Sequence, residues 1–255
     1  MSEDRSASPD TSWNSEKTAL VTGASKRIGR AIALCLAKAG WDIGVHYHSS
    51  ENEAESLADE IEALGRRAVL LDADLSDAGS AQELIPRCAD MLGAPSCLVN
   101  NASLFQHDTL ASLSVESWQS HMGTNLLAPV LLSRNFSKNL PESHRGVIIN
   151  IIDQRIHHPS PDFFSYSVSK TGLWWVTQTM AQALAPRIRV NAVSPGPVLP
   201  SIHQTDEEFQ EELKSTLLRH SAPPEDIAGA VLYLVEASSV TGQMLTVDSG
   251  QHLAR

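Results

Sequence analysis

The sequence has few cysteines, few basic residues and no long apolar run. Its three cysteines are an odd number without metal-binding spacing, which favours buried reduced thiols over a disulfide framework and suits the cytoplasm. No apolar stretch approaches the roughly 20 residues that span a bilayer, so no membrane association is expected. Lys and Arg number 19 against 30 Asp and Glu, with no basic block, so nucleic acid is not an expected partner.

The sequence indicates a single folded domain with one large hydrophobic core. Residues 1–16 are polar and lack the features of a signal or transit peptide, so we expect a disordered arm there. Residues 17–255 alternate apolar, strand-like runs with longer amphipathic segments, without repeats or linkers. This alternation predicts a single-domain α/β fold of the Rossmann type, a doubly wound parallel sheet of about seven strands with helices on both faces.

The expected elements follow from hydrophobic periodicity and from turn and cap residues. The predicted strands are 18–22, 42–47, 68–71, 97–99, 147–152, 188–193 and 244–247. The predicted helices are 27–38, 51–64, 77–92, 115–139 with a bend near Pro129, 163–184, 206–219 and 224–236. In such sheets ligands bind beyond the carboxyl ends of the strands.

A glycine-containing turn joins the first strand to its helix and offers free N–H groups to a pyrophosphate. The glycine spacing by itself also suits an ordinary strand-to-helix turn. Its sequence, TGASKRIG, resembles the TGxxxGxG fingerprint of the short-chain dehydrogenase/reductase family, with Arg27 in place of the middle glycine as in the family's pteridine reductases. The resemblance implies cofactor contacts from Gly23, Ser25, Lys26, Arg27, Ile28 and Gly29.

The end of the second strand indicates which dinucleotide is bound. NAD enzymes place an acid there for the ribose 2′-OH, whereas this chain has no acid before Glu51. Donors suited to a 2′-phosphate stand there instead, and Lys26 or Arg27 can reach the same region. NADP is therefore the expected cofactor, with contacts from His46, Tyr47, His48 and Ser49. A metal bound by His46 and His48 lacks further ligands, so no metal is expected.

Three more strand ends carry motifs that resemble those of the family. Asp74 and Leu75 match the segment that contacts adenine, and Asn101, Ala102 and Ser103 match the NNAG motif with Ser for Gly, again as in the pteridine reductases. The turn after the sixth strand resembles the family's PG turn beside the nicotinamide, which implies contacts from Pro195, Gly196 and Val198.

Tyr166 and Lys170 share one helical face because they are four residues apart. An ammonium one turn away lowers the pKa of a phenol and so prepares it for acid–base chemistry, although a surface pair would have the same spacing. The segment resembles the YxxxK active site of the family, in which the lysine also holds the nicotinamide ribose. Asn125 matches the family's additional active-site asparagine, which supports a proton-relay water.

Asp153 stands where most members of the family have a serine that binds the substrate carbonyl. A carboxylate cannot donate to a carbonyl oxygen, but it suits a substrate with ring N–H and amino groups. The pteridine reductases and the related bacterial dihydromonapterin/dihydrofolate reductases carry Asp there. The register leaves another arrangement open, in which Asp153 is a surface acid and Ser160 is nearby.

Phe105 stands two residues after Ser103, where the pteridine reductases have an aromatic that stacks on the pterin; a core Phe is the alternative. We therefore expect an NADPH-dependent pterin reductase, with substrate contacts from Arg27, Ser103, Phe105, Asp153 and Tyr166. A mobile lid is expected up to about Ala222, and the resemblance implies a homotetramer. The rivals are a carbonyl or 3-oxoacyl-thioester reductase and a non-catalytic NADP-sensing protein.

Overall fold

Seven parallel strands form one sheet, as the sequence predicts, and their order is β3-β2-β1-β4-β5-β6-β7. The computed structural model describes residues 17–200 and 204–254, so the expected N-terminal arm lies outside the described residues. The strands are β1 (Thr18–Val21), β2 (Asp42–Tyr47), β3 (Ala68–Asp72), β4 (Cys97–Asn100), β5 (Gly146–Ile151), β6 (Ile188–Pro195) and β7 (Met244–Val247).

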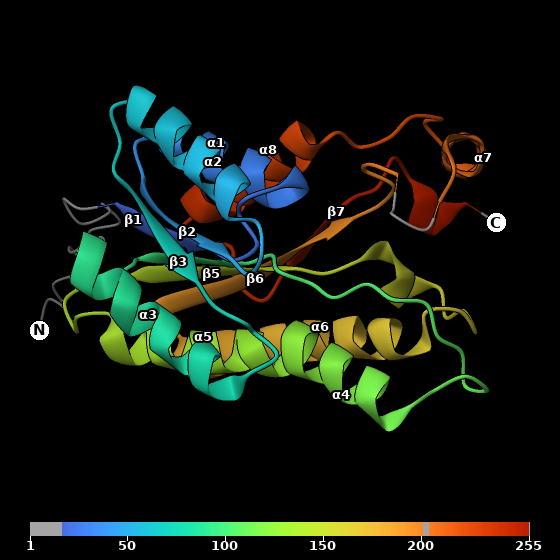
Figure 1. Ribbon diagram of the computed structural model, residues 1–255, viewed down its shortest axis with the longest axis horizontal. Helices are drawn as coiled ribbons and strands as arrows, with labels where there is room; N and C mark the ends of the chain where they lie inside the picture. The colour runs from blue at the N-terminus through green and yellow to red at the C-terminus, as the bar shows by residue number, and fades with distance from the viewer. Residues whose placement is uncertain (1–16, 201–203, 255) are drawn as a thin grey trace, which may run out of the picture.

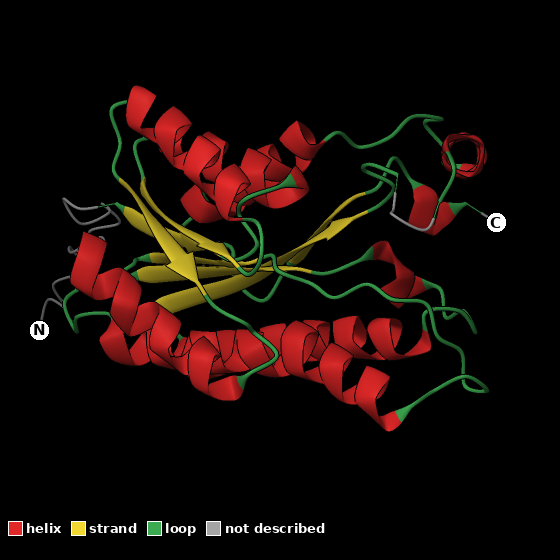
Figure 2. Ribbon diagram, viewed as in Figure 1, coloured by secondary structure: helices red, strands yellow, loops and turns green. Residues whose placement is uncertain are grey.

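Helices cover both faces of the sheet, which makes the fold doubly wound (Figure 1). On one face lie α1 (Arg27–Lys38), α2 (Glu51–Ala63) and α8 (Pro224–Glu236). On the other lie α3 (Ala78–Leu92), α4 (Val115–Met122), α5 (Ala128–Asn139) and α6 (Phe164–Leu184). Figure 2 separates the sheet from the two helical layers, with α7 (Asp206–Ser215) beyond the carboxyl-terminal end of β7. No helix in the described ranges is long and apolar enough to cross a bilayer.

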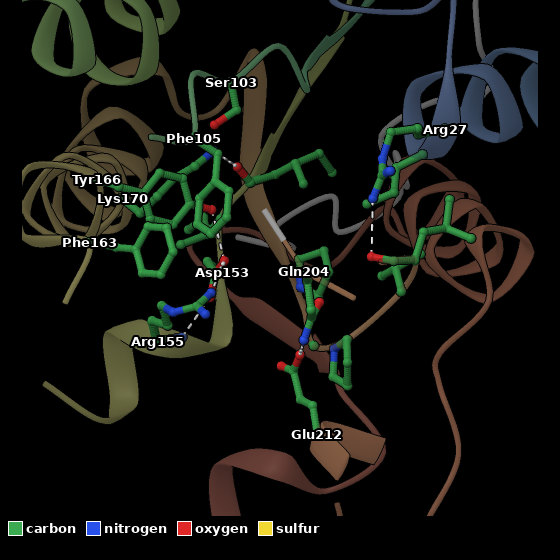
Figure 3. Close-up of a pocket in the computed structure, with 18 of the residues that line it drawn as sticks. Arg27, Ser103, Phe105, Asp153, Arg155, Phe163, Tyr166, Lys170, Gln204 and Glu212 are labelled. Atoms are coloured by element: carbon green, nitrogen blue, oxygen red, sulfur yellow. Dashed lines mark hydrogen bonds and ion pairs between the residues drawn. The ribbon is translucent and has the colours of Figure 1, made fainter. Parts of the chain in front are cut away.

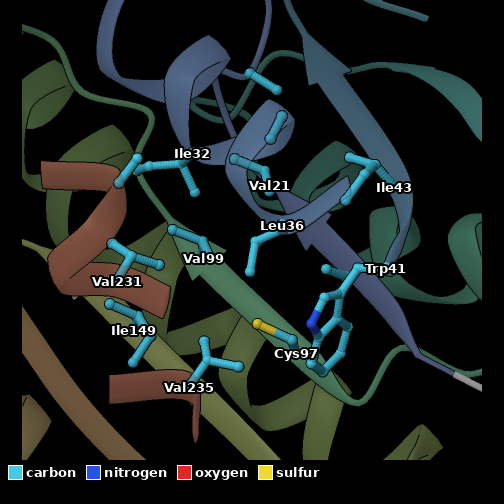
Figure 4. Close-up of a cluster of buried hydrophobic side chains, with 14 of the residues drawn as sticks. Val21, Ile32, Leu36, Trp41, Ile43, Cys97, Val99, Ile149, Val231 and Val235 are labelled. Atoms are coloured by element: carbon cyan, nitrogen blue, oxygen red, sulfur yellow. The ribbon is translucent and has the colours of Figure 1, made fainter. Parts of the chain in front are cut away.

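The central strands are apolar on both faces because each face is covered by helices. Val21, Val99 and Ile149 enter the core beneath α1 and α8 (Figure 4). Leu20 and Leu98, which alternate with them along the strands, enter the second core beneath α3 and α5. Parallel pairing of Leu20 with Leu98 aligns the carboxyl ends of these strands at one edge, where the turns that follow them meet.

The long helix expected over 115–139 is interrupted just before Pro129, near the place where a bend was expected. A π-helical segment, Gly123–Leu127, separates α4 from α5, and Pro129 lies in the first turn of α5. Pro129 has no N–H to donate to the carbonyl of Asn125, and the N–H of Ala128 reaches back five residues to Gly123. The widened turn carries Asn125, whose side chain is completely buried.

Candidate active site

Two cavities open at the carboxyl ends of the strands. We call the first, of about 620 Å³, the turn cavity; it is lined by the residues predicted for the cofactor: Gly23, Ser25, Lys26, Arg27, Ile28, Gly29, His46, Tyr47, His48, Ser49, Asp74, Leu75, Asn101, Ala102 and Ser103. The second, of about 850 Å³, is the tyrosine cavity; among its lining residues are Arg27, Ser103, Phe105, Asp153, Tyr166, Lys170, Pro195, Gly196 and Val198. The two cavities adjoin and share the lining residues Arg27, Ile28, Asn101, Ser103, Leu104 and Gln106.

The turn between β1 and α1 is held by a close approach of backbone to backbone. A Cβ at Gly29 would lie 2.1 Å from the carbonyl oxygen of Gly23, so this position accepts no side chain. Gly23 has a φ of +61°, in the left-handed region that favours glycine. The amide of Asn101 donates to the carbonyls of Thr22 (2.8 Å) and Gly23 (3.1 Å) and so ties the turn to the end of β4. The sequence pattern finds these residues because the turn requires them.

His46 braces this turn from inside the fold. Its Nδ1 accepts from the N–H of Gly23 (2.9 Å), and its Nε2 lies 3.2 Å from the carbonyl of Ala73. Burial lowers the pKa of His46 to about 4, so the ring is neutral at physiological pH. Because both ring nitrogens have protein partners, the side chain shapes the cofactor turn, whereas the sequence suggested a direct contact.

The side chains beyond β2 give the turn cavity a phosphate-compatible end. His48 and Ser49 are exposed there. The ammonium of Lys26 also lies at this end and forms an ion pair with the carboxylate of Glu53 at 2.7 Å. Asp74 accepts from the N–H of Ser76 at 2.9 Å, and this hydrogen bond lowers the pKa of Asp74. No acid ends β2 itself, so these residues fit a dinucleotide that carries a 2′-phosphate.

Arg27 is turned away from that end of the cavity. Its guanidinium donates to the carbonyls of Leu199 (3.1 Å) and Pro200 (3.0 Å), in the segment that follows β6 (Figure 3). Of the two cations expected near a 2′-phosphate, Lys26 lies beside this end of the cavity, whereas the guanidinium of Arg27 is bonded to the segment after β6. Arg27 also has a φ of +53°, so its backbone is strained where the wider family has glycine.

Asp153 lies in the tyrosine cavity, which resolves the question of register. The hydroxyl of Tyr166 donates to Oδ2 of Asp153 at 2.8 Å, and the N–H of Arg155 donates to Oδ1 at 2.8 Å. Ser160, the alternative, is exposed and its hydroxyl accepts from the N–H of Asp162. Asp153 stands two residues after the end of β5 and Tyr166 lies in the first turn of α6, so the fold itself brings them together.

The pKa of Tyr166 moves in the direction opposite to the one expected. Burial, followed by the carboxylate of Asp153, raises this pKa well above its ordinary value. Lys170 donates to the carbonyl of Ile151 at 2.9 Å, and its Nζ lies 5.8 Å from the centre of the Tyr166 ring. Burial lowers the pKa of Lys170 to about 8. The tyrosine therefore retains its proton, and its partner carboxylate is the acceptor.

Phe105 belongs to an aromatic cluster that the sequence revealed only in part. Its ring stacks on Phe163 with centroids 4.4 Å apart and planes 9° apart, and it meets the ring of Tyr166 edge-on at 4.7 Å. The guanidinium of Arg155 lies 5.4 Å and 5.1 Å from the centroids of Phe105 and Phe163. Phe105 lines the cavity and is half-buried, so it is not simply a core residue.

Asn125 lies outside both cavities and holds the loop that carries Ser103 and Phe105. Its amide donates to the carbonyl of Leu104 (2.9 Å) and to Ser169 (3.0 Å), and its oxygen accepts from the N–H of Leu104 (2.7 Å) and from Ser103 (3.3 Å). These four bonds use the full capacity of the side chain. The implied water therefore has no place on this side chain, which positions the loop.

The wall opposite Phe105 comes from residues that the sequence pattern did not single out. Gln204, Glu208, Phe209 and Glu212 line the tyrosine cavity from α7 and the residues before it. The sequence indicated only a lid in this region because these residues belong to no motif. The sequence also did not identify Arg155 and Phe163 as site residues, because their contacts depend on the conformation of the segment between β5 and α6.

A family model described as short chain dehydrogenase matches residues 17–211. The chain belongs to the short-chain dehydrogenase family. Membership confirms the expected fold and an oxidoreductase of this type.

Solved structures and curated sequences point to two kinds of relative within the family. The chain is 43% identical to the FolM alternative dihydrofolate reductase 1 of Brucella suis, with a TM-score of 0.91 over 94% of this chain and 96% of that one. The Brucella canis protein of the same name is 42% identical, with a TM-score of 0.89 over 94% and 95%. Both were crystallised with NADP, in agreement with the expected cofactor.

A curated relative with another activity is the 3-oxoacyl-[acyl-carrier-protein] reductase FabG of Staphylococcus epidermidis. It is 31% identical over 93% of this chain and 99% of its own length. The relatives therefore agree on reduction and differ in the substrates that their names print.

Proposed function

We propose that this protein is an NADPH-dependent reductase of a dihydropterin. The observation that carries the proposal is the carboxylate of Asp153, which accepts a hydrogen bond from Tyr166 at 2.8 Å inside the tyrosine cavity. A carboxylate at this place can accept from ring N–H and amino groups but cannot donate to a ketone oxygen. A pterin offers such donors.

The turn cavity fits NADPH. The backbone of the turn between β1 and α1 and the polar side chains beyond β2 would hold the cofactor there. When bound, NADPH supplies the hydride for the carbon of a ring C=N bond. Lys170 and Tyr166 line the adjoining cavity, where Lys170 would bind the ribose hydroxyls. Phe105 offers its ring as a flat surface for the pterin, and the stack on Phe163 keeps that surface in one orientation.

The proton for the ring nitrogen comes from Tyr166 in this proposal. In the free site the pKa of Tyr166 is raised by burial and by Asp153, which keeps the proton on the phenol. Donors of a bound pterin would share the negative charge of Asp153 and weaken its effect on the phenol. Lys170 then favours the phenolate left by proton transfer, so substrate binding prepares the acid.

The other candidate is reduction of a 3-oxoacyl thioester, which is favoured by the name of the relative from Staphylococcus epidermidis. That reaction needs donors to a carbonyl oxygen, and Asp153 takes the place of such a donor. The greater identity to the two Brucella proteins, 43% and 42% against 31%, adds support for the pterin.

A parallel assay separates the candidates. NADPH oxidation is followed with a 7,8-dihydropterin, dihydrofolate and an acetoacetyl thioester. Turnover of a dihydropterin is expected; turnover of the thioester alone would refute the proposal, and NADPH binding without any turnover would favour a sensor.

An isosteric variant tests the role of the carboxylate. Asp153→Asn should lower kcat with a dihydropterin by at least about 100-fold, the range typical of a lost acid–base partner, and leave the Kd of NADPH unchanged. Asp162→Asn is the matched control, because it removes an exposed carboxylate from the same segment between β5 and α6. A near-normal rate for Asp153→Asn would remove Asp153 from the mechanism.

A further inference from the structure

The wall of the tyrosine cavity formed by α7 is acidic. Thr205 caps this helix, and Glu208 completes a capping box with it. Buried Phe209 anchors the helix on the fold. Glu208 and Glu212, four residues apart on one helical face, both line the cavity. The carboxylates are therefore held at the cavity by regular structure.

The partners of Glu212 among the described residues are two neutral amides. One carboxylate oxygen accepts from the amide of Gln204 at 2.9 Å, and the other accepts from the amide of Gln251 at 3.1 Å. Figure 3 shows Gln204 and Glu212 apart from the Phe105–Phe163 pair. These bonds orient a half-buried carboxylate without neutralising it.

Three cations also line this cavity, and each has another partner; Lys170 donates to the carbonyl of Ile151. Arg155 lies 3.6 Å from the carboxylate of Asp153, and Arg27 donates to the carbonyls of Leu199 and Pro200. Within residues 17–200 and 204–254, no ion pair includes Glu208 or Glu212. Among the described residues, the α7 side of the cavity therefore carries two carboxylates that have no cationic partner.

We infer that Glu208 and Glu212 determine which pterin side chain the enzyme accepts; this rests on the proposed function. With the ring between Asp153 and Phe105, the remaining cavity receives the side chain of the pterin. A carboxylated side chain meets like charge there, whereas hydroxyl groups donate to the same carboxylates. The preferred substrate is a dihydropterin with a hydroxylated, uncharged side chain, and a pterin with a glutamate tail is disfavoured.

The test compares kcat/KM for 6-hydroxymethyl-7,8-dihydropterin and for dihydrofolate, with saturating NADPH. In the variants Glu208→Gln and Glu212→Gln, the ratio of the two values should move towards dihydrofolate by about fivefold each, the effect of one unit charge several ångströms away. Glutamine keeps the hydrogen-bonding acceptor and suits the capping box. Glu207→Gln changes an exposed acid of the same helix outside the cavity lining and should leave the ratio at the wild-type value.

The salt dependence of kcat/KM tests the same inference on the wild-type enzyme. Because salt screens charge repulsion, kcat/KM for dihydrofolate should rise between about 20 mM and 300 mM salt, while the value for the uncharged pterin stays level. A ratio unmoved by both glutamine variants, or moved equally by Glu207→Gln, would overturn the inference and leave pterin reduction standing. Absence of turnover with both dihydropterins would overturn the proposed function and the inference together.

Discussion

Replacement of Lys170 by methionine should make the protein more stable and inactive. Lys170 is 2% exposed, and burial lowers the pKa of its ammonium from the ordinary 10.5 to about 8. This difference corresponds to about 3 kcal/mol by which folding is penalised at neutral pH. Methionine retains the apolar stem but leaves the carbonyl of Ile151 without its donor, a cost of about 1–2 kcal/mol.

The net gain in the free energy of unfolding is therefore about 1–2 kcal/mol at pH 7, or a rise in Tm of about 5 °C. Urea denaturation and thermal unfolding measure it, and activity with any substrate should fall at least about 100-fold. Lys138→Met, at an exposed position, should stay within about 0.5 kcal/mol of the wild type.

The pH dependence of stability checks the same reasoning. Between about pH 8 and pH 10 the unfolded chain keeps the proton of Lys170 while the folded protein loses it, so the stability of the wild type should rise with pH. Above about pH 10 the unfolded chain loses the proton of Tyr166 while the folded protein keeps it, and stability should fall. A methionine variant less stable than the wild type at pH 7, or no rise from pH 8 to pH 9.5, would refute the account.

Three further substitutions test other parts of the site. Gly29→Ala places a Cβ 2.1 Å from the carbonyl oxygen of Gly23, and fluorescence titration should give at least tenfold weaker NADPH binding, about 1.4 kcal/mol. His46→Leu removes the acceptor for the same turn and should lower the free energy of unfolding by about 2 kcal/mol in urea, and unchanged stability would refute its bracing role. Arg155→Met removes the cation beside Asp153 but keeps the backbone donor, so kcat for a dihydropterin should fall about tenfold with the Kd of NADPH unchanged.

The sheet and most helices could be predicted because local signals agree with the tertiary fold. The apolar residues 147–152 can be covered on both faces only in a central strand, and they place β5 to within one residue. The oxygen of Asp77 accepts from the N–H of Ser80 and starts α3 next to the predicted boundary. The strand-end motifs were found for the same reason, since each turn requires its own residue types.

Elements that depend on distant contacts were misjudged. The helix predicted to reach residue 219 ends at Ser215, because the N–H of Leu218 donates to the carbonyl of Ser249 near the C-terminus. Phe163 has a φ of +55° and lies against Phe105, a partner 58 positions away that no local pattern reveals. The pKa of Tyr166 was misjudged because burial outweighs the neighbouring lysine, and burial is not visible in a spacing of four residues.

Arg27 gives the two cavities a common side chain. Its backbone forms part of the cofactor turn, and its guanidinium is bonded to the segment that walls the substrate side. A ligand that draws the guanidinium away from these carbonyls loosens that segment, and a ligand that stabilises the segment holds the guanidinium in place. Thermodynamic linkage then requires that each ligand change the affinity for the other by the same factor, so this arginine would couple the two binding equilibria.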